Sequence, residues 1–212
     1  MNVDLAAGTV SGFATETIGA VERLTGSPFD DVLLGDALAN LFVGGAGNDQ
    51  LEGRESNDTL QGGLGNDTLR GGLGNDSVRG EDGDDGLFGD DGNDTLIGGA
   101  GVNTLEGGVG TDTADYQAAT SGVTVDLTLN TATGFSTETL TLMESINGSA
   151  FNDVLRGDGL INRLDGKAGD DTLLGEAGND TLIGGLGLDV ISGGLGTDTC
   201  TDVADTRDTC ER

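Results

Sequence analysis

An acidic residue recurs at every ninth position along most of the chain. In the stretch GGLGNDTLRGGLGNDSVRG, residues 62–80, Asp67 and Asp76 each stand five residues after a glycine that opens a row of nine. Glycine carries no side chain, so the main-chain carbonyl oxygens beside each carboxylate stay accessible. Carboxylate and carbonyl oxygens together are the ligands that a hard cation such as Ca2+ prefers. The repeated phrase therefore predicts a ladder of cation sites.

The candidate ligands occupy the sixth position of the rows in two arrays. Ten rows open with glycines from Gly26 to Gly107, and six open with glycines from Gly148 to Gly193. The acidic candidates at position six are Asp31, Asp49, Asp58, Asp67, Asp76, Asp85, Asp94 and Asp112 in the first array, and Asp153, Asp171, Asp180, Asp189 and Asp198 in the second.

Some rows depart from this pattern. The row GRESNDTLQ puts Arg54 and Ser56 where glycines are expected, which counts against a site at Asp58. A neutral amide, which we expect to be a weaker ligand or to mark an end of the stack, fills position six at Asn40, Asn103 and Asn162. Additional acidic candidates stand at position two, at Asp36, Asp90 and Asp158.

Charge and composition leave two explanations open. The 212 residues include 38 acidic and 9 basic side chains, which gives a net charge of −29, and only 3% of the residues are aromatic. A chain of this kind repels itself and has little apolar surface to bury, so its composition alone is typical of disorder. The alternative is a fold completed by an external counter-charge, supplied by a basic partner or by cations. The regular recurrence at position six favours cations over a solvated acidic surface.

The spacing also predicts the elements that position the carboxylates. The first six residues of a row favour a tight turn, and the last three form a short strand whose central residue, at position eight, points inward. Two rows make one coil of 18 residues with a turn on each edge, so ligands meet between rows such as those of Asp49 and Asp67. The expected fold is all-β, a parallel β-solenoid with a core of position-eight residues such as Leu69 and Leu87.

A longer repeat contains the short one. A shift of 122 residues aligns VDLAAGTVSGFATETIGAVERLTGSPFDDVLLGD, which begins at Val3, with VDLTLNTATGFSTETLTLMESINGSAFNDVLRGD, which begins at Val125, without a gap. We therefore expect two tandem copies of one module. Their parts are a leader of strands at 1–25, a first array at 26–115, a second leader at 116–147, a second array at 148–201 and a C-terminal cap at 202–212.

Both cysteines lie near the end of the sequence. Cys200 occupies position eight of the last row, and Cys210 follows ten residues later. A disulfide between them would fold the intervening residues over the last coil as a lid, and would indicate an oxidising, extracellular setting. A buried free thiol at Cys200 is the alternative. No apolar stretch is long enough to span a membrane, and no signal peptide is visible at the start.

Rows such as GGAGNDQLE, GGLGNDTLR and GEAGNDTLI resemble the calcium-binding nonapeptides of the repeats-in-toxin (RTX) family. The resemblance covers residues 26–115 and 148–201. The leader segments DYQAATSGVTVDL and INGSAFNDVLRGD are similar to segments that precede such arrays in large secreted RTX proteins. The resemblance implies a parallel β-roll that holds several Ca2+ ions between rows 18 residues apart.

The sequence gives catalysis and nucleic-acid binding no support. The chain has no histidine and no serine in a nucleophile motif, and its charge would repel nucleic acid. We expect an extracellular or cell-surface structural protein that folds on binding Ca2+ and assembles head-to-tail into a surface layer, matrix or filament. The alternative is the C-terminal secretion and folding module of a larger RTX enzyme, toxin or adhesin. The scarcity of aromatic residues disfavours a carbohydrate-binding module.

Overall fold

The computed structural model describes residues 1–11, 16–17 and 21–201, and every regular element in this part of the chain is a β-strand. No helix long and apolar enough to cross a membrane occurs among these residues. The protein divides into two compact units, Met1–Asp112 and Thr113–Arg212. The division falls within the last row of the first array. The predicted parallel β-solenoid is confirmed, and the two units are described in turn.

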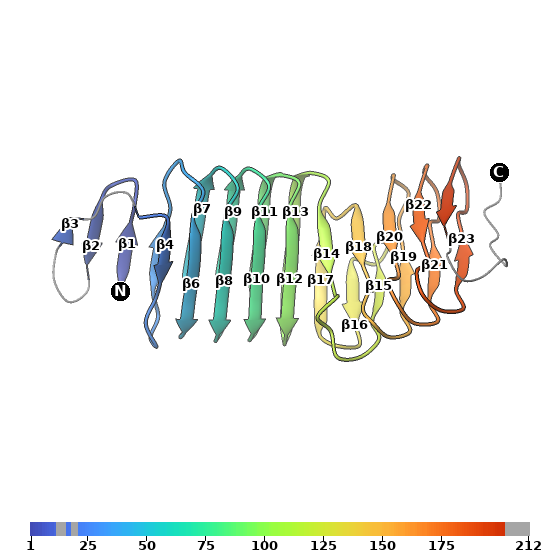
Figure 1. Ribbon diagram of the computed structural model, residues 1–212, viewed down its shortest axis with the longest axis horizontal. Helices are drawn as coiled ribbons and strands as arrows, with labels where there is room; N and C mark the ends of the chain where they lie inside the picture. Colours follow the sequence, from blue (N-terminus) through green and yellow to red (C-terminus); the bar gives the residue numbers. More distant parts are fainter. Residues whose placement is uncertain (12–15, 18–20, 202–212) are drawn as a thin grey trace. The chain divides into compact units, whose positions relative to one another are not determined.

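In the first unit, consecutive strands of the array alternate between two parallel sheets (Figure 1). Leu51 pairs with Leu69, and Leu69 pairs with Leu87, so neighbouring strands in a sheet are 18 residues apart. Two rows therefore make one coil, as the spacing predicts. The strands are β1 (Asn2–Asp4), β2 (Thr9–Ser11), β3 (Glu16–Thr17), β4 (Arg23–Thr25), β5 (Val32–Leu34), β6 (Leu41–Ala46), β7 (Gln50–Glu55), β8 (Thr59–Leu64), β9 (Thr68–Leu73), β10 (Ser77–Asp82), β11 (Gly86–Gly92), β12 (Thr95–Ala100) and β13 (Val102–Gly110).

The second unit repeats this arrangement with shorter strands. Leu155 pairs with Leu173 in one sheet, and Leu164 pairs with Leu182 in the other. The strands are β14 (Thr113–Asp115), β15 (Thr124–Asp126), β16 (Thr131–Thr133), β17 (Thr137–Thr141), β18 (Ser145–Asn147), β19 (Val154–Arg156), β20 (Arg163–Asp165), β21 (Thr172–Leu174), β22 (Thr181–Ile183), β23 (Val190–Ser192) and β24 (Thr199–Thr201).

Each leader joins its array through one parallel strand and adds antiparallel strands of its own. Val3 in β1 pairs with Leu33 in β5, and Val125 in β15 pairs with Leu155 in β19. The other edge of β1 pairs antiparallel with β2, and that of β15 pairs antiparallel with β16. The alternating apolar residues predict these strands, whereas the antiparallel pairing emerges only from the structure. The leader strand therefore lies between the first strand of its array in this sheet and an antiparallel strand of the leader.

Position-eight residues form the core of both arrays. Leu51, Leu69 and Leu87 have no exposed surface, because side chains alternate along a strand and the second residue of β7, β9 and β11 points inward. These strands run to six or seven residues, longer than the three that the sequence predicts, because they continue into the glycines that open the next row. Cys200 continues this column in β24, opposite Leu182. Its expected partner Cys210 lies outside the described residues, so the disulfide stays a prediction.

Replacing a core leucine tests this packing. Leu69→Ala leaves a cavity because Leu51 and Leu87 are held by their own strand pairs, and we expect the free energy of unfolding in calcium to fall by about 2–5 kcal/mol. Leu64→Ala, at the exposed last residue of β8, which is 56% exposed, is the control and should change it by less than about 0.5 kcal/mol. Urea denaturation measures both, and equal losses would contradict the inward placement of Leu69.

Candidate metal centre

Position-six side chains lie buried at the end of each turn. Asp49, Asp67 and Asp85 are each no more than 3% exposed. The main-chain N–H of Asp49 donates to Oδ1 of Asp67 over 2.7 Å, and that of Asp67 donates to Oδ1 of Asp85 over 2.8 Å. The same bond joins Asp153 to Asp171 over 2.8 Å. Each carboxylate is therefore fixed against the residue 18 positions before it, in the pairs that the sequence predicts.

Among the residues that the structure describes, the second oxygen of most of these carboxylates has no hydrogen-bond partner. A buried, charged oxygen without a hydrogen bond is strongly unfavourable, so these carboxyl groups favour either a proton or a cation from outside the chain. The unpartnered, buried Oδ2 atoms belong to Asp49, Asp58, Asp67, Asp76, Asp85, Asp94, Asp171, Asp180 and Asp198.

At most of these turns, a main-chain carbonyl oxygen and the unpartnered carboxylate oxygen face the same space beside a glycine. A Cβ added to Gly62, at position one, would collide with Oδ2 of Asp67 and lie 2.9 Å from the carbonyl oxygen of Gly80. A Cβ added to Gly166 would likewise collide with Oδ2 of Asp171. Two kinds of oxygen acceptor thus converge on space that only a glycine leaves open. The recurrence of glycine at position one is explained by this oxygen-lined space.

The pKa values of most of these carboxyl groups are raised, because burial disfavours the charged form. Burial raises the pKa of Asp67 and Asp171 to about 7 and that of Asp58 to about 6, against an ordinary value of 3.8. The amide hydrogen bond from the residue 18 positions earlier opposes the rise, and neighbouring carboxylates, such as Asp85 beside Asp67, add to it. Burial raises the pKa in the same direction at Asp49, Asp76, Asp85, Asp94 and Asp180.

The donor set suits calcium. None of the described residues belongs to a group of three or more acidic, cysteine or histidine side chains placed to hold a metal ion. An ion bound at Oδ2 of Asp67 would therefore need main-chain carbonyl oxygens or water to complete its shell. Calcium accepts six to eight oxygen ligands in irregular geometry, whereas zinc prefers nitrogen and sulfur. The residues present therefore fit Ca2+.

The amide residues at position six fall into two groups. Oδ1 of Asn103 accepts the N–H of Asp85 over 3.0 Å, so Asn103 continues the ladder without a charge. Oδ1 of Asn162 instead accepts an N–H of its own turn, from Asp158, over 2.8 Å. Asn40 makes the equivalent bond within its turn over 3.0 Å. Asn40 and Asn162 therefore differ in their contacts from the rest of the ladder.

Asp31 and Asp153, the first acidic residues of the two arrays, also differ. Burial raises the pKa of Asp31, but hydrogen bonds from the Met1 ammonium and from Ser27 outweigh this effect, and the net pKa lies below its usual value. Both oxygens of Asp153 accept hydrogen bonds from Ser149. Neither residue has an unpartnered oxygen of the kind found at Asp67.

The departing row GRESNDTLQ keeps the turn despite its side chains. Arg54 and Ser56 adopt left-handed backbone conformations, with φ of 83° and 75°, as the glycines do in other rows. Asp58, in this row, still presents an unpartnered Oδ2. The missing glycines therefore do not remove the oxygen-lined space, and Asp58 stays a proposed ligand.

The acidic residues at position two have protein partners. Oδ1 of Asp36 and of Asp158 each accepts an N–H two residues later in its own turn, over 2.8 and 2.7 Å. Asp90 forms an ion pair with Arg70. These side chains thus shape turns and surface pairs in the structure, and their part in ion binding stays a prediction.

Sequence reasoning missed a second ladder at position five. Oδ1 of Asn48 accepts the N–H of Asn66 over 2.8 Å, and Oδ1 of Asn57 accepts the N–H of Asn75 over 2.8 Å. In these bonds the later row donates to the row 18 residues before it, whereas in the position-six bonds the earlier row donates to the later one. The recurring Asn-Asp dipeptide was the signal that could have revealed them. The turns are therefore cross-linked on both sides of the carboxylate.

Comparison with known families supports this assignment. A family model described as the RTX calcium-binding nonapeptide repeat (4 copies) matches more than half of the chain. Repeats of this family bind Ca2+, and the buried position-six aspartates agree with that property. A search of curated proteins finds no match. The matched ranges are 19–51, 34–69, 43–78, 52–87, 61–96, 79–114, 143–159 and 161–200.

The raised pKa values predict how pH acts on the calcium-free protein. Because the pKa of Asp67 is about 7 in the fold and 3.8 ordinarily, its contribution stabilises the calcium-free fold below about pH 4 and is lost as the pH rises through about 7. We therefore expect the β-signal of calcium-depleted protein, followed by circular dichroism, to decline between about pH 4 and about pH 8.

A matched pair of variants separates this effect from general charge repulsion. Asp67→Asn removes the buried charge and should move the loss of structure to higher pH. Asp91→Asn removes one charge at an exposed position and should move it less. Equal shifts in the two variants would mean that net charge, and not the buried carboxylate, controls the transition.

Proposed function

Because the chain belongs to the RTX calcium-binding nonapeptide repeat family, we propose that it is an extracellular structural protein whose β-roll folds on binding several Ca2+ ions. The observation that carries the proposal is the repeated, buried and unpartnered Oδ2 atom, such as that of Asp67, beside a turn carbonyl. The ligands we propose are the acidic residues at position six, with weaker contributions from the amides there.

Electrostatics supports coupling between folding and calcium. The chain carries a net charge of −29, and folding stacks its position-six carboxylates in columns. Without cations, folding must either bury those charges or protonate them. Calcium binds the folded turns and has no comparable site in the extended chain, so its binding free energy adds to the stability of the fold.

A non-catalytic role agrees with the layout of the site. The RTX β-roll is a structural calcium-binding repeat and not a catalytic fold. The same carboxylate and carbonyl pair recurs from turn to turn, as at Asp67 and Asp171, which is the layout of a ligand ladder. We therefore propose that the calcium-filled roll itself is the functional object.

Calcium titration followed by far-UV circular dichroism tests the proposal. We expect calcium-depleted protein near neutral pH to lack most of its β-signal, and to gain it cooperatively as calcium approaches the range of about 0.1–1 mM that is typical of extracellular modules. Asp67→Asn should raise the midpoint, whereas Asp91→Asn, which removes an exposed charge, should change it little. A full β-signal in excess chelator would refute calcium-dependent folding.

We further propose that the protein assembles head-to-tail into a layer, matrix or filament, as the unpaired strand edges suggest. Among the described residues, β4 pairs only with β6, β23 only with β21, and β24 only with β22. The last rows also expose Leu186, Leu188 and Leu195, with exposures of 57% to 77%. Open edges and exposed apolar side chains favour association with another chain.

Electron microscopy and light scattering of the calcium-bound protein test assembly. We expect particles that grow in one direction with concentration. The pair Leu188→Asn and Leu195→Ser should reduce growth without unfolding the roll, and Leu129→Ser, at an equally exposed position, should not. Monodisperse particles at high concentration would reject assembly and favour the alternative role, a folding module of a larger secreted protein.

A further inference from the structure

The first coil of each array differs from every later coil in its turns. We call residues 26–43 and 148–165 the starter coils. Their four turns read GSPFDD, GDALAN, GSAFND and GDGLIN, with serine or aspartate at position two and a large apolar residue at position four. Later rows favour glycine at both positions. In both modules, the first two turns of the array therefore differ from the later repeats at positions two and four.

The backbone of the starter turns differs as well. Position two has a left-handed φ in the later rows whatever the residue, including 83° at Arg54 and 73° at Lys167. Ser27, Ser149 and their neighbours in the starter coils are absent from the positive-φ conformations of the described residues. The left-handed position-two residues are Gly45, Arg54, Gly63, Gly72, Glu81, Asp90, Gly99, Gly108, Lys167, Glu176, Gly185 and Gly194.

In the first starter turn, protein donors satisfy the carboxylate that later turns leave unpartnered. The N–H of Ser149 donates to Oδ2 of Asp153 over 2.6 Å, and its hydroxyl donates to Oδ1 over 2.8 Å. The N–H of Val123, in the leader, also donates to Oδ1 over 2.8 Å. In the first module, the N–H and hydroxyl of Ser27 bind Asp31 in the same way.

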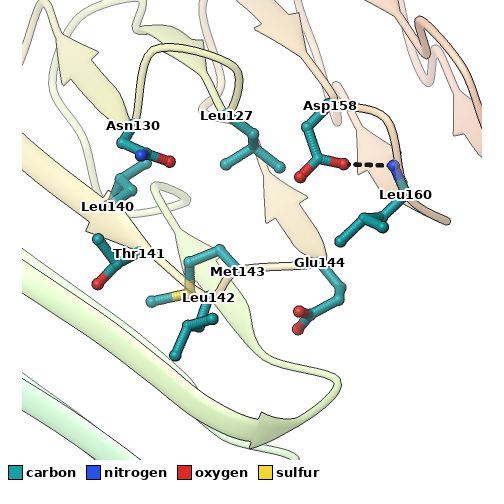
Figure 2. Close-up of a pocket in the computed structure, with 9 residues that line it drawn as sticks. All are labelled: Leu127, Asn130, Leu140, Thr141, Leu142, Met143, Glu144, Asp158 and Leu160. Atoms are coloured by element: carbon teal, nitrogen blue, oxygen red, sulfur yellow. Dashed lines mark hydrogen bonds between the residues drawn. The ribbon is translucent and has the colours of Figure 1, made fainter.

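In the second starter turn, an amide replaces the carboxylate. The N–H of Asp158 donates to Oδ1 of Asn162, and Oδ1 of Asp158 accepts the N–H of Leu160. Figure 2 shows this last bond at the rim of a hollow of about 290 Å3, which Leu127 and Met143 of the leader also line. The turn closes on itself and lies against its leader.

Unpartnered carboxylates begin at the third row in both modules. Oδ2 of Asp49 is the first in one array, and Oδ2 of Asp171 is the first in the other. Before these rows, each position-six oxygen that faces its turn has a hydrogen-bond donor from the protein. The need for an external cation therefore starts one coil into each array.

An arginine also ties each starter coil to the structure on both sides of it. Arg54 donates from β7 to Asp4 in β1 over 2.9 Å and to the carbonyl oxygen of Gly35 in the starter coil over 2.6 Å. Arg156, within the other starter coil, lies 3.5 Å from Asp126 in β15 and 2.6 Å from Glu176. The two arginines come from different rows, and yet each connects a leader strand, the starter coil and the coil that follows it.

We infer that the leader and starter coil of each module fold without calcium and form the template on which the calcium-dependent rows stack. The inference rests on the proposed function, because it divides one roll into a calcium-independent start and a calcium-dependent remainder. A preformed parallel edge lowers the entropic cost of adding the next strand, since the register is already set. Folding should then spread from the starter coil toward the C-terminal rows of each array.

Hydrogen–deuterium exchange of the full chain at increasing calcium tests this order. In chelator we expect amides in 148–165 to exchange at least about tenfold more slowly than those in 166–200, and protection to extend row by row as calcium rises. The inference fails if all rows gain protection at one calcium concentration, or if protection starts at the C-terminal rows. Protection of every row in chelator would instead refute the proposed function.

A substitution that turns a starter turn into a later turn sharpens the test. Ser149→Gly with Phe151→Gly produces the turn GGAGND, so protection of 148–165 should disappear in chelator and return at about 1 mM calcium. The first array, unchanged in the same molecule, is the internal control. Ser192→Ala, outside the starter coil, should leave the order unchanged. Retained protection of 148–165 in chelator in the double variant would overturn the inference.

Discussion

A buried carboxylate oxygen without a partner is the constraint on which the rest of this structure depends. Oδ2 of Asp67 illustrates it: this oxygen and the carbonyl oxygen of Gly80 face the same space beside Gly62, and no donor among the described residues reaches Oδ2. The glycine at position one, the raised pKa of the carboxyl and the need for a cation all follow from this one placement. An isolated turn could avoid the problem by exposing its carboxylate, but a stacked turn cannot.

The same 18-residue register serves the core and the turns. Leu51, Leu69 and Leu87 stack on the inner face of the sheet, while in the adjoining turns the amide of Asp49 holds the buried carboxylate of Asp67. One inward aliphatic residue in nine buries little apolar surface for the backbone entropy that each row loses. The hydrogen-bonded carboxylate columns and their counter-ions therefore belong to the stabilising interior of the roll as much as the leucines do.

The starter coils meet the same constraint with the chain's own donors. Ser149 supplies through its N–H and hydroxyl what later turns lack, and Asn162 removes the charge altogether. Both modules place these turns directly after a leader strand, where the register of the roll is first set. In the folding order we infer, a start that needs no calcium is followed by rows that depend on it.

The sequence by itself determined the period, the parallel coil of two rows, the inward position-eight residues such as Leu69, and the acidic column that includes Asp67, because each is a direct consequence of spacing. Only the tertiary structure decided which oxygens are satisfied. Asp153 and Asp171 occupy the same position in neighbouring rows of one sheet, and the difference between them arises from the Ser149 donors and the backbone conformation of the turn. Arg54 likewise takes a left-handed backbone at a position where most rows have glycine. Its side chain donates to Asp4, fifty residues earlier, and the nine-residue pattern does not predict this contact.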